Sequence, residues 1–315
     1  MRIIRNRPEW SDGAYVPGRT AVAIGNFDGV HLGHQALIAR CRELAGAGED
    51  TAVVTFEPLP LAYFRPELAP PRLTTVYRKL ELLQALEVDH TWLMRFDTAL
   101  AALEPQAFVE RILVERMRAW HVVIGSDFRF GKDRTGSIEL LAYLGEELDF
   151  SVNVVPSVML DGERISSSGI RKMLAAGDFD GAARWLGRPF RMEGRVLRGA
   201  GLGRKLGYPT ANLAVRAEPS PVTGVLAAWA RIGDGPWLPS VTNLGRRPVV
   251  DGKETLLEVH FFDFDEDLYG QRLDVQFVAK LRDELDFEGL EALVDQMKQD
   301  EAAARDCLAA ADVPE

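Results

Sequence analysis

Short apolar runs alternate with helix-length amphipathic stretches between residues 20 and 185, and this alternation constrains the fold more than any other feature. Strands are predicted over residues 21–24, 51–56, 90–95, 122–125 and 152–155, and helices over 33–45, 76–86, 105–118 and 137–148. Strands that are separated by helices form a parallel sheet with right-handed crossovers. The first part of the chain is therefore predicted to be a parallel α/β sheet.

The pattern of predicted elements changes after two further helices, 168–176 and 179–186, which end at Gly187-Arg188-Pro189. Beyond this point strands are predicted over residues 190–197, 225–232, 238–242, 256–264 and 272–280 with no helices between them. A last helix carries an apolar stripe at i, i+3, i+4 and i+7, formed by Leu290, Leu293, Val294 and Met297. We expect an antiparallel β-barrel with a closing helix. The predicted domains are 1–186 and 187–315.

Length, charge and cysteine usage limit the class of protein. A chain of 315 residues is expected to hold two domains. Its net charge of -10 argues against a nucleic-acid or membrane partner. The two cysteines, Cys41 and Cys307, form no pair motif, and no run is long enough to be a signal peptide or a membrane span. We expect a cytoplasmic protein; the sequence is silent on oligomeric state.

The stretch from Gly25 to His34 is the clearest candidate site. An apolar strand ends at Gly25, a turn follows, and His31 and His34 then stand three residues apart, on one face of a helix. Ligands bind open α/β sheets at the carboxyl ends of the strands, and a helix N-terminus favours phosphate. A lone histidine more often caps or packs a helix, but two in a glycine-containing turn favour stabilisation of phosphate charge. The common dinucleotide and P-loop fingerprints do not occur.

Longer strings carry a family resemblance. The HxGH pattern after a strand resembles that of the nucleotidyltransferases related to class I tRNA synthetases. The full string GNFDGVHLGH at 25–34 resembles prokaryotic bifunctional riboflavin kinase/FAD synthetases, and so do five later strings in the same order: TFEP at 55–58, GSDFRFG at 125–131, ISSSGIR at 165–171, GRKLGYPTAN at 203–212 and LEVH at 257–260. The resemblance implies ATP-dependent phosphorylation of riboflavin to FMN, releasing ADP, and adenylylation of FMN to FAD with release of pyrophosphate.

In the first domain, the resemblance implies catalytic roles for His31 and His34. It also implies binding of nucleotide and flavin by Gly25, Asn26, Phe27, Asp28, Phe56, Asp127, Phe128 and Arg129, and of the ATP phosphates by Ser166, Ser167 and Arg171. An aromatic ring can flank the flat flavin, and an arginine can face a phosphate. Simpler explanations stay open: the 125–131 loop is stapled by its own aromatic residues, and the serines are ordinary helix N-caps.

In the second domain, backbone N–H groups of a glycine-rich loop can cradle an anion. The resemblance implies that Gly199, Gly203, Arg204 and Lys205 bind ATP there. Thr210 and Asn212 offer oxygen ligands of the kind that Mg²⁺ prefers, and the resemblance makes them the metal site. A strand glutamate usually faces solvent, but the resemblance makes Glu258 the general base that deprotonates the ribityl 5′-hydroxyl.

Two alternatives remain at this point. One is an FMN adenylyltransferase whose second domain is a decayed kinase that binds or senses flavin. The other is a flavin-binding module without turnover. The metal pair and Glu258 argue against the second alternative.

Overall fold

The computed structural model describes residues 1–5, 18–199, 203, 206–214, 219–249 and 252–314. Contacts divide the chain into two compact units. One consists of Met1–Pro70 and Thr74–Ser166, and the other of Pro71–Leu73 and Ser167–Glu315. Each unit is described by itself below.

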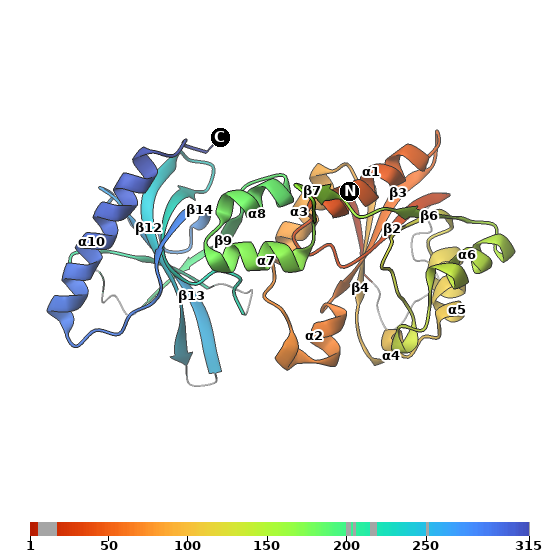
Figure 1. Cartoon of the computed structure of the whole chain (residues 1–315), viewed down its shortest axis with the longest axis horizontal. Coiled ribbons are helices and arrows are strands. Elements are labelled where there is room, and N and C mark those ends of the chain that lie inside the picture. Colours follow the sequence, from red (N-terminus) through yellow and green to blue (C-terminus); the bar gives the residue numbers. More distant parts are fainter. Residues whose placement is uncertain (6–17, 200–202, 204–205, 215–218, 250–251, 315) are drawn as a thin grey trace. The chain divides into compact units, whose positions relative to one another are not determined.

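The first unit is built on a six-stranded parallel sheet with the order β1-β4-β3-β2-β5-β6. Its strands are β1 (Arg2–Arg5), β2 (Thr20–Ile24), β3 (Asp50–Glu57), β4 (His90–Arg95), β5 (Ala119–Gly125) and β6 (Ser151–Val155). The main helices between them are α1 (Leu32–Leu44), α3 (Val76–Ala85), α5 (Pro105–Phe108) and α6 (Ile138–Glu147) (Figure 1). The predicted parallel α/β sheet is confirmed.

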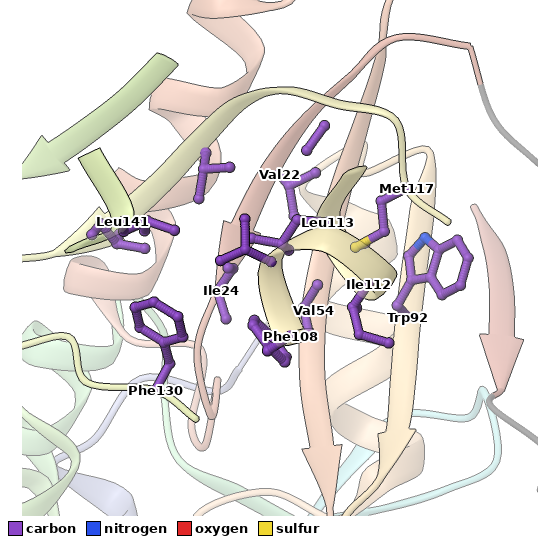
Figure 2. Close-up of a cluster of buried hydrophobic side chains, with 14 of the residues drawn as sticks. Val22, Ile24, Val54, Trp92, Phe108, Ile112, Leu113, Met117, Phe130 and Leu141 are labelled. Carbon is purple, nitrogen blue, oxygen red and sulfur yellow. The ribbon is translucent and has the colours of Figure 1, made fainter. Parts of the chain in front are cut away.

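Alternate residues of the central strands pack on opposite faces of this sheet. Ala21 and Ala23 of β2 pack with the apolar side of α1 and with Leu83 of α3. Val22 and Ile24 of the same strand belong to the cluster on the other face, shown in Figure 2, with residues from α5, α6 and the segment after α5. Because both faces are covered, the strands are apolar throughout, which is why the sequence shows them as continuous runs.

Smaller elements of this unit depart from the predictions. Residues 105–118 do not form one α-helix: α5 is a single turn, and a π-helical segment, η2 (Val109–Val114), follows it. Strand β1 is missing from the predictions because it is a short edge strand, paired only with β4. The remaining short pieces are α2 (Pro60–Phe64), η1 (Pro66–Leu68), α4 (Thr98–Ala101), η3 (Lys132–Arg134), β7 (Met159–Leu160) and β8 (Glu163–Arg164).

The second unit is a closed antiparallel barrel with the order β10-β13-β12-β11-β14-β9, which confirms the predicted barrel. Its strands are β9 (Arg191–Leu197), β10 (Ala211–Ala214), β11 (Gly224–Ile232), β12 (Trp237–Val249), β13 (Gly252–Phe261) and β14 (Arg272–Arg282). The closing helix α10 (Leu290–Ala309) packs on the outside of the barrel through Ala304 and Leu308 (Figure 1). Strand β10 was not predicted, and β12 extends beyond its predicted end at residue 242.

Helices α7 (Ser167–Ala176) and α8 (Phe179–Leu186) group with the barrel. The ring of Phe179 stacks on that of Phe277 in β14, with 5.7 Å between centroids. The predicted boundary at residue 187 rests on the change from helices to strands along the sequence, and it stays a prediction. Among the described residues, no helix combines the length and apolarity that crossing a membrane requires.

Candidate active sites

The turn after β2 brings His31 and His34 together as predicted. His31 is the N-cap residue of α1, and its Nδ1 accepts a hydrogen bond from the backbone N–H of His34 at 3.3 Å. The two imidazole rings stack with 3.7 Å between centroids and 17° between planes. His31 is only 7% exposed, and the ring of Phe27 lies 5.0 Å from that of His34. The pair is therefore held rigidly at the helix N-terminus.

Glycine at position 33 suits the close approach of the His31 ring. A Cβ atom at Gly33 would lie 3.1 Å from Cε1 and Nδ1 of His31 and 3.9 Å from the carbonyl oxygen of Ile165. The last contact also shows that the chain just before Ser166 runs beside the histidines. Three residues near this point are predicted to bind phosphate. Ser166 is the last residue of the first unit, whereas Ser167 and Arg171 belong to α7 in the second unit.

The histidine turn lies where the strand order reverses. From β2 the chain goes on to β3 and β4 on one side of it and then returns to place β5 on the other side. Open α/β sheets bind ligands at such a switch point, at the carboxyl ends of the strands. Phe56 lies near the carboxyl end of β3, and Asp127, Phe128 and Arg129 follow β5. The structure thus places the predicted residues of the first unit, 25–34, 56 and 127–129, at one edge of the sheet.

Aromatic rings gather beside the end of β3. Phe96 contacts Phe56, Tyr63 and Phe64, with centroids 5.8, 5.4 and 5.5 Å apart. Phe64 is exposed although it is apolar. Sequence reasoning included Phe56 in the site but missed Phe96 and Tyr63. Both come from other elements, and only the fold brings them together.

The loop after β5 has mixed roles. The ring of Phe128 stacks on that of Phe130, but Phe130 is buried in the core shown in Figure 2. Asp127 forms an exposed ion pair with Arg164 at 2.6 Å. Arg129 is exposed. Asp127 and Arg129 are thus exposed, Phe128 is partly exposed against the core, and Phe130 is the member of this loop that a ligand cannot reach.

A cavity of about 320 Å³ in the barrel unit brings together the residues predicted for the second site. Thr210, Asn212 and Glu258 all line it, and so does Gly203. Gly199 lies against the same group, since a Cβ atom there would come within 2.5 Å of Asn212 Nδ2. The predicted Arg204 and Lys205 lie outside the described residues.

The strand register fixes the relation between these polar groups. Glu258 of β13 lies opposite Asn212 of β10 on one side and opposite Asn243 of β12 on the other. Residues that face each other across antiparallel strands project on the same side of the sheet. All three line the cavity. Leu257 and Val259, the neighbours of Glu258 in β13, are fully buried inside the barrel, so Glu258 lies on the outer face of β13, where the cavity between the barrel and α10 receives it.

Several cavity residues were not predicted. Tyr208 and His260 lie with ring centroids 5.2 Å apart, and His260 Nδ1 is 2.8 Å from the carbonyl oxygen of Pro209. Partial burial, with the carboxylate of Glu301, raises the pKa of the Tyr208 phenol. Both residues stand in the strings that carried the resemblance, so their position in those strings was the available signal.

An ion pair closes another side of the cavity. The guanidinium of Arg282, at the end of β14, donates to both carboxylate oxygens of Asp300 in α10 at 2.9 and 2.6 Å. Gln296 Nε2 donates to the same carboxylate at 2.9 Å. Both charged residues line the cavity. Nothing in the sequence pairs a strand end with the middle of a distant helix.

The apolar stripe that identified the last helix lies partly on the cavity. Leu293 and Met297 line the cavity, and Leu290 is 59% exposed. The contacts that seat the helix on the barrel come instead from its second half, at Ala304 and Leu308. The stripe thus supplies the apolar wall of the cavity.

Comparisons with known proteins match each part of the chain to a family of its own. A family model described as FAD synthetase matches residues 15–169, and one described as riboflavin kinase matches residues 186–308. A protein of Pseudomonas fluorescens is 47% identical over 285 residues, covering 90% of this chain and 91% of that protein. Relatives from Haemophilus influenzae and Escherichia coli K12 are 38% and 41% identical, each over 90% of this chain and over 93% and 91% of their own lengths. All three are described as bifunctional riboflavin kinase/FMN adenylyltransferases.

Among solved structures, a crystal structure described as a macrolide-efflux protein from Streptococcus pneumoniae has the same fold. It matches with a TM-score of 0.78 and 29% identity, over 97% of this chain and 99% of that one.

Proposed function

The chain belongs to the bifunctional riboflavin kinase/FMN adenylyltransferase family, and from this premise we propose how its two sites divide the two reactions. It is a transferase that phosphorylates riboflavin to FMN and adenylylates FMN to FAD. We place adenylyl transfer in residues 1–186 and phosphorylation in residues 187–315. The observation that carries this assignment is the meeting of Thr210, Asn212 and Glu258 in one cavity of the second unit, whereas the histidine turn belongs to the first unit.

For phosphorylation, Glu258 is the general base. It takes the proton of the riboflavin 5′-hydroxyl as that oxygen attacks the γ-phosphorus of ATP, and ADP leaves. Leu293 and Met297 form an apolar wall of the cavity, which suits a flavin ring. The polar side near Gly203, Thr210 and Asn212 suits the phosphates. Positioning contributes most of the acceleration in such reactions, because the phosphoryl group needs little covalent assistance.

Thr210 and Asn212 are proposed to hold Mg²⁺. The hydroxyl and the amide oxygen are hard donors, and both residues line the cavity beside Glu258. The narrow approach of Gly199 to Asn212 restricts where that amide can lie, as expected of a ligand that must be held in place. When bound, the metal neutralises charge on the phosphates. Gly199, Gly203, Arg204 and Lys205 are proposed to bind the phosphates from the loop side.

For adenylyl transfer, a phosphate oxygen of FMN attacks the α-phosphorus of ATP, and the bond to the β-phosphate bridging oxygen breaks to release pyrophosphate. The attacking group is already an anion, so no base is required. His31, His34 and the N-terminus of α1 stabilise the charge that develops on the phosphates. Ser166, Ser167 and Arg171 are proposed to contact the ATP phosphates.

The flavin of FMN is proposed to lie at the carboxyl ends of β3 and β5. Phe56 and Phe128 stand at these ends, and Phe96 and Phe64 extend the aromatic surface. An exposed aromatic surface at a ligand-binding edge suits a flat ring system. Gly25, Asn26, Phe27 and Asp28 form the turn between this surface and the histidines. The partners are small molecules, namely riboflavin, FMN, FAD, ATP, ADP and pyrophosphate, and we propose the cytoplasm as the site of action.

A single assay tests the assignment of both reactions to this chain. The purified full-length protein is incubated with riboflavin, ATP and Mg²⁺, and the flavins are separated by chromatography. FMN is expected first and FAD after it. Formation of FAD from supplied FMN, with none from riboflavin, would instead indicate a barrel unit that has lost its kinase activity.

A further inference from the structure

A lysine is buried directly beneath the turn that leads to the histidines. Lys79 lies on α3 and is 1% exposed. Its Nζ donates to the backbone carbonyl of Asn26 at 2.9 Å and to Thr55 Oγ1 at 3.2 Å. Thr55 Oγ1 in turn donates to the same carbonyl at 2.9 Å. A carbonyl of the turn thus accepts from two side chains of different elements.

The turn has a backbone that needs such support. Phe27 and Val30 have φ angles of 49° and 43°, and Gly29 has a φ angle of 87°. Left-handed conformations are unfavourable for side chains such as phenylalanine and valine, and they persist only where the surroundings hold them. Burying an ammonium group is also unfavourable unless hydrogen bonds compensate for its lost hydration. Both unfavourable features meet at the same turn.

Thr74, which lies just before α3, forms a second set of hydrogen bonds with the turn. The backbone N–H and Oγ1 of Thr74 lie 3.1 and 3.3 Å from Oδ1 of Asp28, and the N–H of Gly29 donates to Thr74 Oγ1 at 3.1 Å. Asp28, which belongs to the turn itself, is buried as well. The turn is therefore attached to residues 74–79 at Asn26, Asp28 and Gly29.

We propose that Lys79 is a positioning residue for adenylyl transfer. Lys79 and Thr55 hold the carbonyl of Asn26, the residue that begins the turn leading to His31, the N-cap of α1. Holding this carbonyl fixes the position of the stacked His31 and His34 imidazoles, which the proposed function sets against the phosphates. Lys79 touches neither substrate; it acts by fixing the turn that carries these histidines. This inference rests on the proposed function of the histidine turn.

The test compares Lys79→Met with Lys79→Gln and Leu83→Ala in the full-length protein. Leu83 is fully buried one helical turn further along α3 and packs in the same cluster as Phe27 and Val30, so its truncation weakens this packing without removing a hydrogen bond to the turn. Lys79→Met is expected to lower kcat for FAD formation from FMN by about 100-fold, the loss that a misplacement of about 1 Å at the reacting groups causes. KM for FMN is expected to stay within about threefold, since the flavin ring binds elsewhere. Lys79→Gln keeps a donor and is expected to recover part of the loss.

Each outcome decides the matter. Riboflavin phosphorylation by the same preparations measures the amount of active protein and the integrity of the barrel unit. Wild-type protein that forms no FAD from FMN would contradict the proposed function itself. Full adenylyl transfer by Lys79→Met, or a loss equal to that of Leu83→Ala at the same fall in Tm, would overturn the positioning role. If the first unit of Lys79→Met fails to fold, Thr55→Val replaces it as the test. This variant removes one of the two donors to the Asn26 carbonyl and is expected to lower kcat by about threefold to tenfold. An unchanged kcat would count against the inference.

Discussion

Asn212 and Glu258 lie directly opposite each other on β10 and β13 and project into the same cavity. This register places a proposed metal ligand beside a proposed base. It also makes the two roles separable, because each side chain comes from its own strand. Substitution of one should alter proton transfer, and substitution of the other should alter the requirement for metal.

Glu258→Gln is expected to abolish riboflavin phosphorylation, with a loss of at least about 100-fold in kcat, because general-base catalysis typically contributes that much. The amide keeps the size of the side chain but cannot take the proton. Initial rates of FMN formation measure the loss, and FAD formation from FMN should be unchanged. Glu284→Gln is the matched control, since Glu284 is another carboxylate of the same cavity. Equal losses in both variants would show that Glu258 is not the base.

Asn212→Ala is expected to raise the Mg²⁺ concentration at which phosphorylation is half-maximal by about tenfold, since one of two protein oxygen ligands is removed. Titration of activity with Mg²⁺ at saturating ATP measures this shift. Asn243→Ala changes the other neighbour of Glu258 and is not expected to move the Mg²⁺ midpoint. A shift of the same size in Asn243→Ala would contradict the assignment of the metal to Thr210 and Asn212.

Local patterns predicted much of the fold and the identity of many site residues. The strand at 90–95 was predicted with its observed bounds, and it is centred on the continuous apolar run Trp92, Leu93 and Met94, which is buried. The spacing of His31 and His34 was enough to place both rings on one face, and the structure adds that they stack. In these cases the information lies within a few residues along the chain.

The remaining features depend on contacts between distant segments. In sequence, Lys79 is one more charged residue of a helix, and only the position of α3 under the turn makes it buried. The periodicity of Leu293 and Met297 predicted an apolar face but not that this face borders a cavity. The helix expected over 105–118 contains a π-helical segment, which periodicity does not reveal.

His31→Asn separates the two roles of the first histidine. Asparagine retains an N-cap acceptor for α1, so we expect little loss of stability, whereas His31→Ala should cost about 1 kcal/mol through loss of the cap. Both variants lose the imidazole and are expected to reduce FAD formation from FMN by about 100-fold or more. Thermal unfolding and initial rates measure the two effects, with riboflavin phosphorylation as the internal control. Normal adenylyl transfer in His31→Asn would mean that His31 only caps the helix.

Arg282 and Asp300 connect the end of β14 to α10 through a partly buried, two-bond ion pair, and residues 284, 285 and 287 of the loop between them line the cavity. Removal of one partner leaves a partly buried charge uncompensated, which costs less than the roughly 3–5 kcal/mol of a fully buried pair. Asp300→Asn is therefore expected to lower the Tm of the barrel unit and to raise KM for riboflavin, because the cavity loses a fixed wall. The double variant Arg282→Met/Asp300→Leu removes both charges and should recover most of the stability. Calorimetry and kinase kinetics on the three proteins measure these effects. If the double variant regains both Tm and KM, the pair only supports the fold; if it regains Tm but not KM, Arg282 or Asp300 also orients the substrate.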